Sequence, residues 1–237
     1  MWLQHATRVL IPAGRWFFRG SRVVGGDRVP PEGPVLAAFN HASFLDPWFV
    51  GMLFPRLPIR FLITEQWYWR NRFWTAFFAG YGTIPTSERR PAETILRVVD
   101  ALARGELVGI FPEGRISHDG RMNEVRHGVG WIAALSGAPV LPCGLRGDYA
   151  ALPRQRRFPR RHPVELFVGR PLRFPGGPVA RPAPAAVHAF TCEVAAEIAR
   201  LAGQEDRVDA VLPPREPRDI VPLLGRAREA ILARPAR

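Results

Sequence analysis

The sequence predicts an α/β fold with a mostly parallel central sheet flanked by helices. Short apolar runs alternate with longer amphipathic segments, which is the pattern of strand and helix units in a parallel sheet. The length of 237 residues suits one α/β domain with a substantial core. The apolar runs that we predict as strands are 35–39, 59–63, 107–111, 137–145 and 164–169.

Segments between and after these strands predict the helices. Asp46 lies before Pro47, which suits Asp46 to a helix N-cap and Pro47 to the first turn. Residues 65–81 are aromatic on nearly every side, which is typical of a helix that is either buried in the core or in contact with lipid. The predicted helices are 47–53, 65–81, 91–102, 127–136, 185–202 and 223–232.

The chain divides into three predicted parts. Residues 1–25 are an N-terminal interfacial helical segment, because Trp and Phe alternate there with Arg as in segments that lie in a membrane interface. Packing of the same segment on the core of the domain is an equal alternative. Residues 26–203 form the main α/β domain. Residues 204–237 are an Arg- and Pro-rich C-terminal tail, which we expect to be loosely attached.

The composition indicates a polyanionic partner. All 33 basic side chains are arginines, and the 21 acidic residues leave a net charge of +12. Such a charge fits nucleic acid or an anionic membrane surface. The aromatic residues lie in helix-like segments rather than on a strand platform, and no helix-turn-helix or zinc module occurs, so the pattern favours a membrane surface and no nucleic acid.

Other classes of protein are not indicated. Cys143 and Cys192 have neither metal-type nor redox-type spacing. No run of about 18 apolar residues predicts a spanning helix. Residues 1–12 lack the basic start and the small-residue cleavage site of a signal peptide.

His41 and Asp46 form the first candidate pair. They follow the predicted strand 35–39 in a strand-loop-helix corner. In a continuous helix, five residues would separate the two side chains by about 140°, whereas in a corner they can face each other. A histidine beside a carboxylate is the usual general base. The alternative is that Asp46 only caps a helix and His41 only closes a turn.

A second corner carries charged residues after the predicted strand 107–111. Glu113 and Arg115 lie there, at a strand's carboxyl end, where open α/β sheets bind ligands. The guanidinium of an arginine can bind phosphate through two hydrogen bonds. The alternative is an ordinary solvated turn. A further arginine cluster at 154–161 is either a solvated loop or a surface for anionic lipid or an acidic carrier protein.

Four blocks, in order between residues 35 and 145, resemble the PlsC-type glycerolipid acyltransferase family, which includes the 1-acylglycerol-3-phosphate acyltransferases. Residues 40–46 resemble its N-H-x-x-x-x-D block, and residues 82–85 followed by Arg89 resemble its G-x-I…R block. Residues 111–114 resemble its F-P-E-G block, and residues 140–142 its last proline block. Four ordered blocks are far more specific than any single motif.

The resemblance implies a glycerol-3-phosphate acyltransferase-like fold and a role for each matching residue. His41 would deprotonate an acceptor hydroxyl, and Asp46 would orient the histidine. Gly82, Arg89, Glu113 and Gly114 would bind the acceptor, with the arginine on its phosphate; Arg115 is a further candidate there. The resemblance implies no cofactor and no metal. Acyl-CoA or acyl-carrier protein would be the co-substrate.

Two departures from the family pattern leave the acceptor headgroup open. The second block usually has its arginine one position earlier, where this chain has Glu88. The third block often reads F-P-E-G-T-R-S, whereas here Arg115 directly follows Gly114. Both changes move a cation relative to the rest of its block.

We therefore expect a membrane-associated O-acyltransferase at the cytoplasmic face of the cell membrane, peripheral or monotopic. It would transfer a fatty acyl group to a lysophospholipid, with 1-acylglycerol-3-phosphate as the leading acceptor in phosphatidic acid synthesis. One alternative is an acyltransferase for a non-glycerol lipid acceptor. The other is a non-catalytic lipid-binding protein of the same fold. The expected partners are an anionic membrane surface, the lysophospholipid and the acyl donor.

Overall fold

The computed structural model describes residues 2–232, which contain one seven-stranded sheet with the order β1-β7-β6-β2-β5-β3-β4. Only the β6–β7 pair of this described sheet is antiparallel, so the predicted α/β class with a mostly parallel sheet is confirmed. The strands are β1 (Arg22–Val24), β2 (Val35–Phe39), β3 (Arg60–Thr64), β4 (Ile84–Thr86), β5 (Leu107–Ile110), β6 (Val140–Arg146) and β7 (Glu165–Val168).

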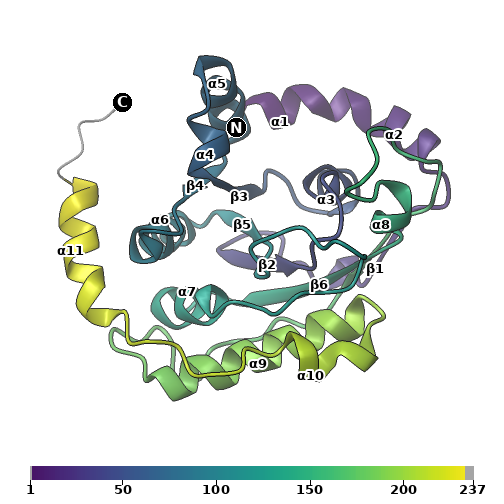
Figure 1. Ribbon diagram of the computed structural model, residues 1–237. Helices are drawn as coiled ribbons and strands as arrows, with labels where there is room; N and C mark the ends of the chain where they lie inside the picture. Colours follow the sequence, from purple (N-terminus) through teal and green to yellow (C-terminus); the bar gives the residue numbers. More distant parts are fainter. Residues whose placement is uncertain (1, 233–237) are drawn as a thin grey trace.

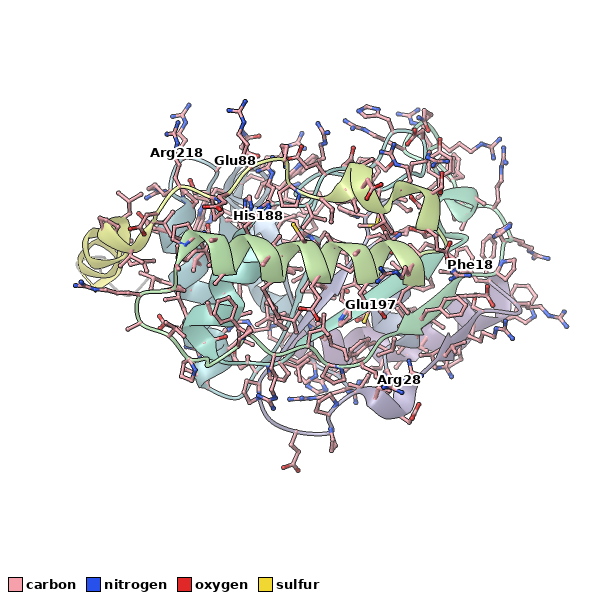
Figure 2. The ribbon with its side chains drawn as sticks, turned by 90° about the horizontal axis from the view of Figure 1, so that it is seen from below. Phe18, Arg28, Glu88, His188, Glu197 and Arg218 are labelled. Carbon is pink, nitrogen blue, oxygen red and sulfur yellow. The ribbon has the colours of Figure 1, made fainter. Side chains whose placement is uncertain are left out.

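The sheet lies between two layers of helices (Figure 1). Leu36 and Ala38 of β2 face a core shared with α6, α7 and α9, whereas Val35, Ala37 and Phe39 face a second core with α3. Figure 2 shows α9 lying along the molecule with His188 and Glu197 on it. The helices are α1 (Trp2–Thr7), α2 (Ile11–Phe17), α3 (Asp46–Leu53), α4 (Glu65–Tyr68), α5 (Arg72–Tyr81), α6 (Pro91–Ala103), α7 (Gly128–Ser136), α8 (Asp148–Ala151), α9 (Pro184–Leu201), α10 (Val208–Val211) and α11 (Val221–Leu232).

The central strand β2 forms as its sequence predicts. All five of its residues are apolar and buried, as expected for a parallel strand covered on both faces. At its end, Asn40 joins β2 to β6: its amide nitrogen donates to the Leu145 carbonyl at 3.1 Å, and its oxygen accepts from the Leu145 N–H at 2.7 Å. The loop that follows β2 therefore starts from a fixed point.

The sequence did not predict β1, and it predicted the region of β4 only as a short extended segment over residues 82–90. Each has only three residues and lies at an edge of the sheet. Val23 and Val24 of β1 are exposed, and β4 contains Pro85, so neither segment shows the apolar run of a buried strand.

The segment 65–81, predicted as one helix, consists of two. Helix α4 ends at Tyr68, and α5 begins at Arg72. The side-chain oxygen of Asn71 accepts from the Trp74 N–H at 3.0 Å, which is an N-cap that starts a new helix. The single-helix prediction was wrong because the aromatic pattern carried no break, although Asn71 itself was a start signal.

The N-terminal segment packs on the domain and also exposes aromatic side chains. Gln4 donates to the carbonyls of Ile59 and Tyr81 at 2.6 Å each, which ties α1 to the body. Helix α1 lies beside α5 (Figure 1). Trp2 and Trp16 remain exposed on this segment. Among residues 2–232, no helix has the length and apolar character needed to cross a bilayer.

The start of the C-terminal tail is firmly attached, which corrects the expectation of loose attachment. The side-chain oxygen of Gln204 accepts from the Met122 N–H at 2.8 Å. Val211 is fully buried, and its carbonyl accepts from the Val125 N–H at 2.9 Å. The predicted helix 223–232 is α11, which packs against α6. The part boundaries at residues 25 and 203 stay a prediction.

Candidate active site

His41 and Asp46 face each other in the loop between β2 and α3. The Nδ1 atom of His41 lies 2.8 Å from Oδ2 of Asp46. The same oxygen accepts hydrogen bonds from the N–H groups of Ala42 and Ser43, both at 2.8 Å. Asp46 is fully buried, whereas the His41 side chain keeps 15% of its surface exposed. The carboxylate thus fixes the ring and turns Nε2 away from itself.

The predicted N-cap role of Asp46 is wrong. Asp46 is the first residue of α3, and Leu45 occupies the cap position without a side-chain hydrogen bond. The Asp46 carboxylate turns back toward the loop because two free N–H groups and the imidazole lie there. Three donors on one oxygen offset much of the cost of burying a charge.

Burial sets the protonation of the pair. Burial lowers the pKa of His41 to about 4, and the neighbouring carboxyl groups of Glu113 and Asp148 oppose this fall. Burial also raises the pKa of Asp46, and the hydrogen bonds from Ser43 and Ala42 oppose this rise. The imidazole is therefore neutral at neutral pH, which is the form that accepts a proton.

The loop after β5 holds the backbone of His41 on both sides. Glu113 is buried, and its Oε1 accepts from the His41 N–H at 2.8 Å. The Ser117 N–H donates to the His41 carbonyl at 2.8 Å. The other carboxylate oxygen of Glu113 accepts from the N–H and the side-chain amide of Asn123, at 2.7 and 2.8 Å. Burial raises the pKa of Glu113 to about 7, and the hydrogen bonds from Asn123 and His41 oppose this rise.

Aromatic stacking fixes the plane of the imidazole. The rings of His41 and Phe111 are stacked with centroids 4.0 Å apart and an interplanar angle of 17°. Phe111 in turn stacks on Phe61, at 5.6 Å and 10°. The histidine is thus held by a carboxylate at one nitrogen and by a ring on one face.

The glycines predicted to bind the acceptor have clear local roles. Gly82 takes a φ of +71° and ends α5, and its carbonyl accepts from Arg60 Nε at 2.6 Å. Gly82 precedes β4, so it lies at the amino ends of the parallel strands. His41 lies at their carboxyl ends, at the opposite end of the sheet. Gly114 has a φ of +70° and lies directly after Glu113. A side-chain carbon at Gly114 would lie 3.0 Å from Arg126 Nε, so the guanidinium of Arg126 covers this glycine.

Arg89 and Arg115 lie at the same end of the sheet as His41, where the parallel strands have their carboxyl ends. Arg89 follows β4 and Arg115 follows β5. Strand β4 is three positions from β2, which corresponds to about 14 Å at the usual strand spacing. Both arginines are exposed, and among the side chains that the structure describes neither guanidinium is engaged in an ion pair. They are therefore open to an external anion.

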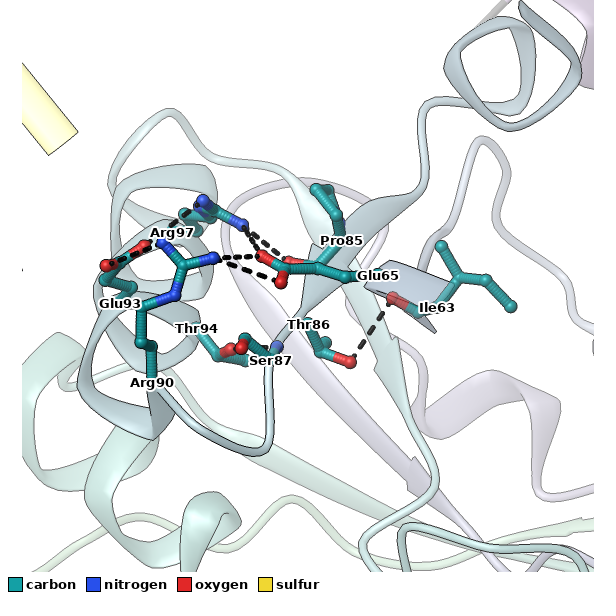
Figure 3. Close-up of polar contacts among 9 residues, drawn as sticks. All are labelled: Ile63, Glu65, Pro85, Thr86, Ser87, Arg90, Glu93, Thr94 and Arg97. Atoms are coloured by element: carbon teal, nitrogen blue, oxygen red, sulfur yellow. Dashed lines mark hydrogen bonds and ion pairs between the residues drawn. The ribbon is translucent and has the colours of Figure 1, made fainter. Parts of the chain in front are cut away.

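Arg90, by contrast, belongs to an internal network that joins α4 to α6 (Figure 3). Its guanidinium bonds both carboxylate oxygens of Glu65 at 3.1 Å and Glu93 at 3.3 Å. Arg97 adds a bond to Glu93 at 3.4 Å. Both consecutive arginines are exposed, but Arg90 is engaged in these ion pairs, so Arg89 is the one left to bind an external anion.

Comparison with known proteins decides the family. Residues 20–146, more than half of the chain, match the family described as Acyltransferase. The chain belongs to the acyltransferase family. The matched residues include His41, Asp46 and Glu113, so the geometry described above lies within the family's own region of this acyltransferase.

Named relatives support the same family. The 1-acyl-sn-glycerol-3-phosphate acyltransferase of Chlamydomonas reinhardtii is 32% identical over 134 residues, which cover 55% of this chain but only 40% of that protein. The protein of the same name in Bacillus subtilis is 23% identical over 155 residues, covering 65% of this chain and 74% of that protein. The crystal structure of the 1-acyl-sn-glycerophosphate acyltransferase PlsC from Thermotoga maritima aligns with a TM-score of 0.63 at 17% identity. That alignment covers 99% of this chain and 81% of PlsC, and at this identity it shows the fold.

Sequence reasoning missed two side chains of this acyltransferase site. Asp148 opens α8 just after β6 and is 3% exposed. Its position past a strand's carboxyl end, like that of His41 and Glu113, was a usable signal. Asn123 bonds Glu113 from a loop ten residues later, and no pattern marked it.

Two hollows on the surface of the acyltransferase lie away from His41. One has a volume of about 340 Å³ and is lined by charged residues that include Arg28 and Glu197. The other, of about 500 Å³, lies between Arg181 and Pro222. His41 does not line either hollow, so neither hollow belongs to the site formed by His41 and Asp46.

Proposed function

We propose that this acyltransferase transfers a fatty acyl group from acyl-CoA or acyl-carrier protein to the free hydroxyl of 1-acylglycerol-3-phosphate. The product would be phosphatidic acid. The observation that carries the proposal is the 2.8 Å contact between His41 Nδ1 and Asp46 Oδ2 at the carboxyl end of β2. The names of the relatives supply the acceptor.

The geometry supports general-base catalysis by His41. With Nδ1–H donating to Asp46, Nε2 takes the proton of the acceptor hydroxyl as its oxygen attacks the thioester carbonyl carbon. The tetrahedral intermediate collapses, the carbon–sulfur bond breaks, and the imidazolium returns the proton to the leaving thiolate. Asp46 stabilises the imidazolium between these two transfers.

Two exposed arginines are candidates for the acceptor phosphate. Arg89 and Arg115 present guanidinium groups at the end of the sheet that carries His41, and each can bind a phosphate through two hydrogen bonds. Both carboxylate oxygens of Glu113 already accept hydrogen bonds, from His41 and from Asn123. Its contribution would therefore be to hold His41 in place and not to bind the acceptor. Gly114 would let the chain and Arg126 approach each other closely at this corner.

An aromatic surface supports action at a membrane. We define it by its exposed residues Trp2, Trp16, Trp67, Trp69 and Phe73. These side chains come from α1, α2 and the α4–α5 region, and Arg161 lies over the ring of Trp16 at 5.0 Å. Trp with Arg suits the headgroup region of an anionic bilayer. The proposed location is the cytoplasmic face of the cell membrane, with peripheral or monotopic attachment.

A non-glycerol lipid acceptor is the second candidate. Glu88 stands where the family usually has an arginine, and its carboxylate bonds Arg126 at 3.2 Å. This contact puts the negative charge of Glu88 near Gly114 and partly neutralises the guanidinium of Arg126, which lies over that glycine. An acceptor with a smaller anionic charge than a phosphate monoester would fit such a corner.

Acyl transfer with defined substrates tests the function. Purified protein is incubated with radiolabelled acyl-CoA or acyl-carrier protein and with lysophosphatidate, lysophosphatidylglycerol, monoacylglycerol or an N-acyl amino acid whose acyl chain carries a free hydroxyl. We expect transfer to lysophosphatidate to exceed transfer to monoacylglycerol. Preference for the N-acyl amino acid would favour the second candidate, and absence of transfer to every hydroxyl lipid would overturn the enzyme reading.

A further inference from the structure

Asp148 lies against the candidate dyad from a third strand. It follows β6, which is paired with β2 on the side opposite to β5. Asp46 is fully buried and Asp148 is 3% exposed, and each carboxyl group acts on the pKa of the other, which places the two groups side by side. A second buried carboxyl group therefore contacts the carboxylate that orients His41.

Each of the two carboxyl groups has one oxygen that no other group satisfies. Oδ1 of Asp46 and Oδ2 of Asp148 are buried, and no described residue donates a hydrogen bond to either oxygen. Two ionised carboxylates in contact repel each other strongly, and buried acceptors without donors are costly. A single proton between the groups removes the repulsion and supplies the missing donor.

The other hydrogen bonds decide which group carries this proton. Asp46 receives three donors on Oδ2, from His41, Ala42 and Ser43. For Asp148, the nearby backbone N–H groups of Asp148 itself and of Tyr149 act to lower its pKa. Donors stabilise the charged form of a carboxyl group, so the negative charge belongs on Asp46 and the proton on Asp148.

We propose that Asp148 is a positioning residue that stays protonated at neutral pH and donates a hydrogen bond to Asp46, keeping Asp46 ionised beside His41. Burial and the charge of Asp46 raise the pKa of Asp148 well above its ordinary range, in agreement with this role. The same hydrogen bond opposes the rise that burial causes in the pKa of Asp46. The other titratable groups facing the pair are His41 from the β2 loop and Glu113 from the β5 loop.

The proposal rests on the proposed function for its catalytic meaning. His41 becomes positively charged while it holds the proton of the acceptor, and an ionised Asp46 stabilises that charge. Without the donor on Oδ1, Asp46 would take up the proton itself. The imidazolium would then lose its counter-charge at the step where it forms.

Two substitutions separate a proton donor from a packing residue. In Asp148→Asn, the amide has the shape of the protonated acid and can donate to Asp46, so acyl transfer should stay within about threefold of the wild type. In Asp148→Ala, Asp46 loses its donor, and kcat should fall by about 10- to 100-fold with little change in KM. Without its donor, Asp46 takes up a proton more readily. The acid limb of the kcat/KM profile should therefore also move to higher pH in Asp148→Ala but not in Asp148→Asn. Equal losses in both variants without any shift of the limb would overturn the proposal.

Infrared spectroscopy tests the proton without relying on activity. Recorded above pH 7, where Glu113 gives up its proton, the wild type should show the C=O stretch of a protonated carboxyl group. The band should disappear in Asp148→Asn and persist in Glu113→Gln, which is the matched control. A band that survives in Asp148→Asn contradicts the assignment. If the wild type transfers no acyl group at all, the proposed function fails, and the infrared result still decides whether Asp148 carries the proton.

Discussion

The side-chain carboxylate of Glu113 accepts a hydrogen bond from the backbone N–H of His41 at 2.8 Å. Together with the bond from the Ser117 N–H to the His41 carbonyl, it couples the loops after β2 and β5. The acidic residue of the F-P-E-G block thus acts on the position of the histidine. This relationship leads to a prediction that separates positioning from acceptor binding.

Replacing Glu113 by Ala should lower kcat by about tenfold or more and leave KM for the acceptor nearly unchanged, because the N–H of His41 loses its partner. Unfolding free energy should fall by roughly 1–3 kcal/mol, since buried donors are left unsatisfied. Steady-state kinetics and denaturant unfolding measure both. Glu124→Ala, at an exposed site in the same loop, is the control. A raised KM at unchanged kcat would instead support the acceptor-binding role predicted from the sequence.

Replacing His41 by Ala should reduce acyl transfer by about 10²- to 10⁴-fold, the range for loss of a general base. Binding to anionic liposomes should not change, because His41 lies outside the aromatic surface. Radiolabelled transfer and liposome sedimentation give the two values. His5→Ala, an exposed histidine on α1, serves as the control for activity. A fully active His41→Ala enzyme would remove His41 from its proposed role.

Arg89→Ala should raise KM for a phosphate-bearing acceptor by an amount equivalent to about 1.5–3 kcal/mol, the value of a charged hydrogen-bond partner. Arg90→Ala is the matched control, because Arg90 already pairs with Glu65 and Glu93. It should leave KM nearly unchanged and cost about 0–1 kcal/mol of stability, as for other partly exposed ion pairs. If KM rises in Arg115→Ala and not in Arg89→Ala, the acceptor phosphate binds at the loop after β5 instead.

The low pKa of His41 predicts a pH dependence of stability. In the unfolded chain, His41 takes up a proton near its ordinary pKa of 6.5, whereas burial delays this to about 4 in the folded state. The contribution of His41 to the free energy of unfolding is therefore complete above pH 6.5. It is lost as the pH falls toward 4, by about 3 kcal/mol in total. The unfolding free energies of the wild type and His41→Gln, compared at each pH, isolate this contribution. A difference that stays constant from pH 7 to 4 would contradict it.

The aromatic surface should control membrane attachment. Trp16 and Phe73 are 62% and 68% exposed, and substitution of each by Ala should weaken binding to anionic liposomes by up to about 1.5–3 kcal/mol. Leu223→Ala, on α11 away from this surface, is the control. Sedimentation at low and high salt measures the affinity. Equal binding by all variants would exclude this surface as the attachment site.

Much of the fold could be predicted because the central strands are uniform apolar runs bounded by breakers. Val35–Phe39 was predicted with its correct ends since all five side chains are buried and prolines precede it. Edge strands such as Arg22–Val24 escaped, because exposed three-residue strands carry no apolar pattern. The corner geometry allowed His41 and Asp46 to face each other, and the resemblance of four blocks to the family favoured this pairing over a simple cap and turn.

The surroundings of the dyad could not be predicted in the same way. The donors to Asp46 are backbone N–H groups, which every residue possesses and no sequence pattern marks. Asn123 reaches Glu113 across a loop of ten residues that carries no recognisable pattern. Asp148 reaches the site from the end of β6, and this placement depends on the order of strands in the sheet. Strand order is a property of the whole chain, so local patterns do not contain it.

The placement of the site on three neighbouring strands has a consequence for biosynthesis. A nascent chain that ends before β6 already contains His41, Asp46 and Glu113, yet β2 still lacks the neighbour that holds Asn40. Asp46 also lacks its contact with Asp148 at that stage. The dyad therefore reaches its final surroundings only after the ribosome has delivered β6, and a chain truncated before it would carry the family motifs without a finished reaction centre.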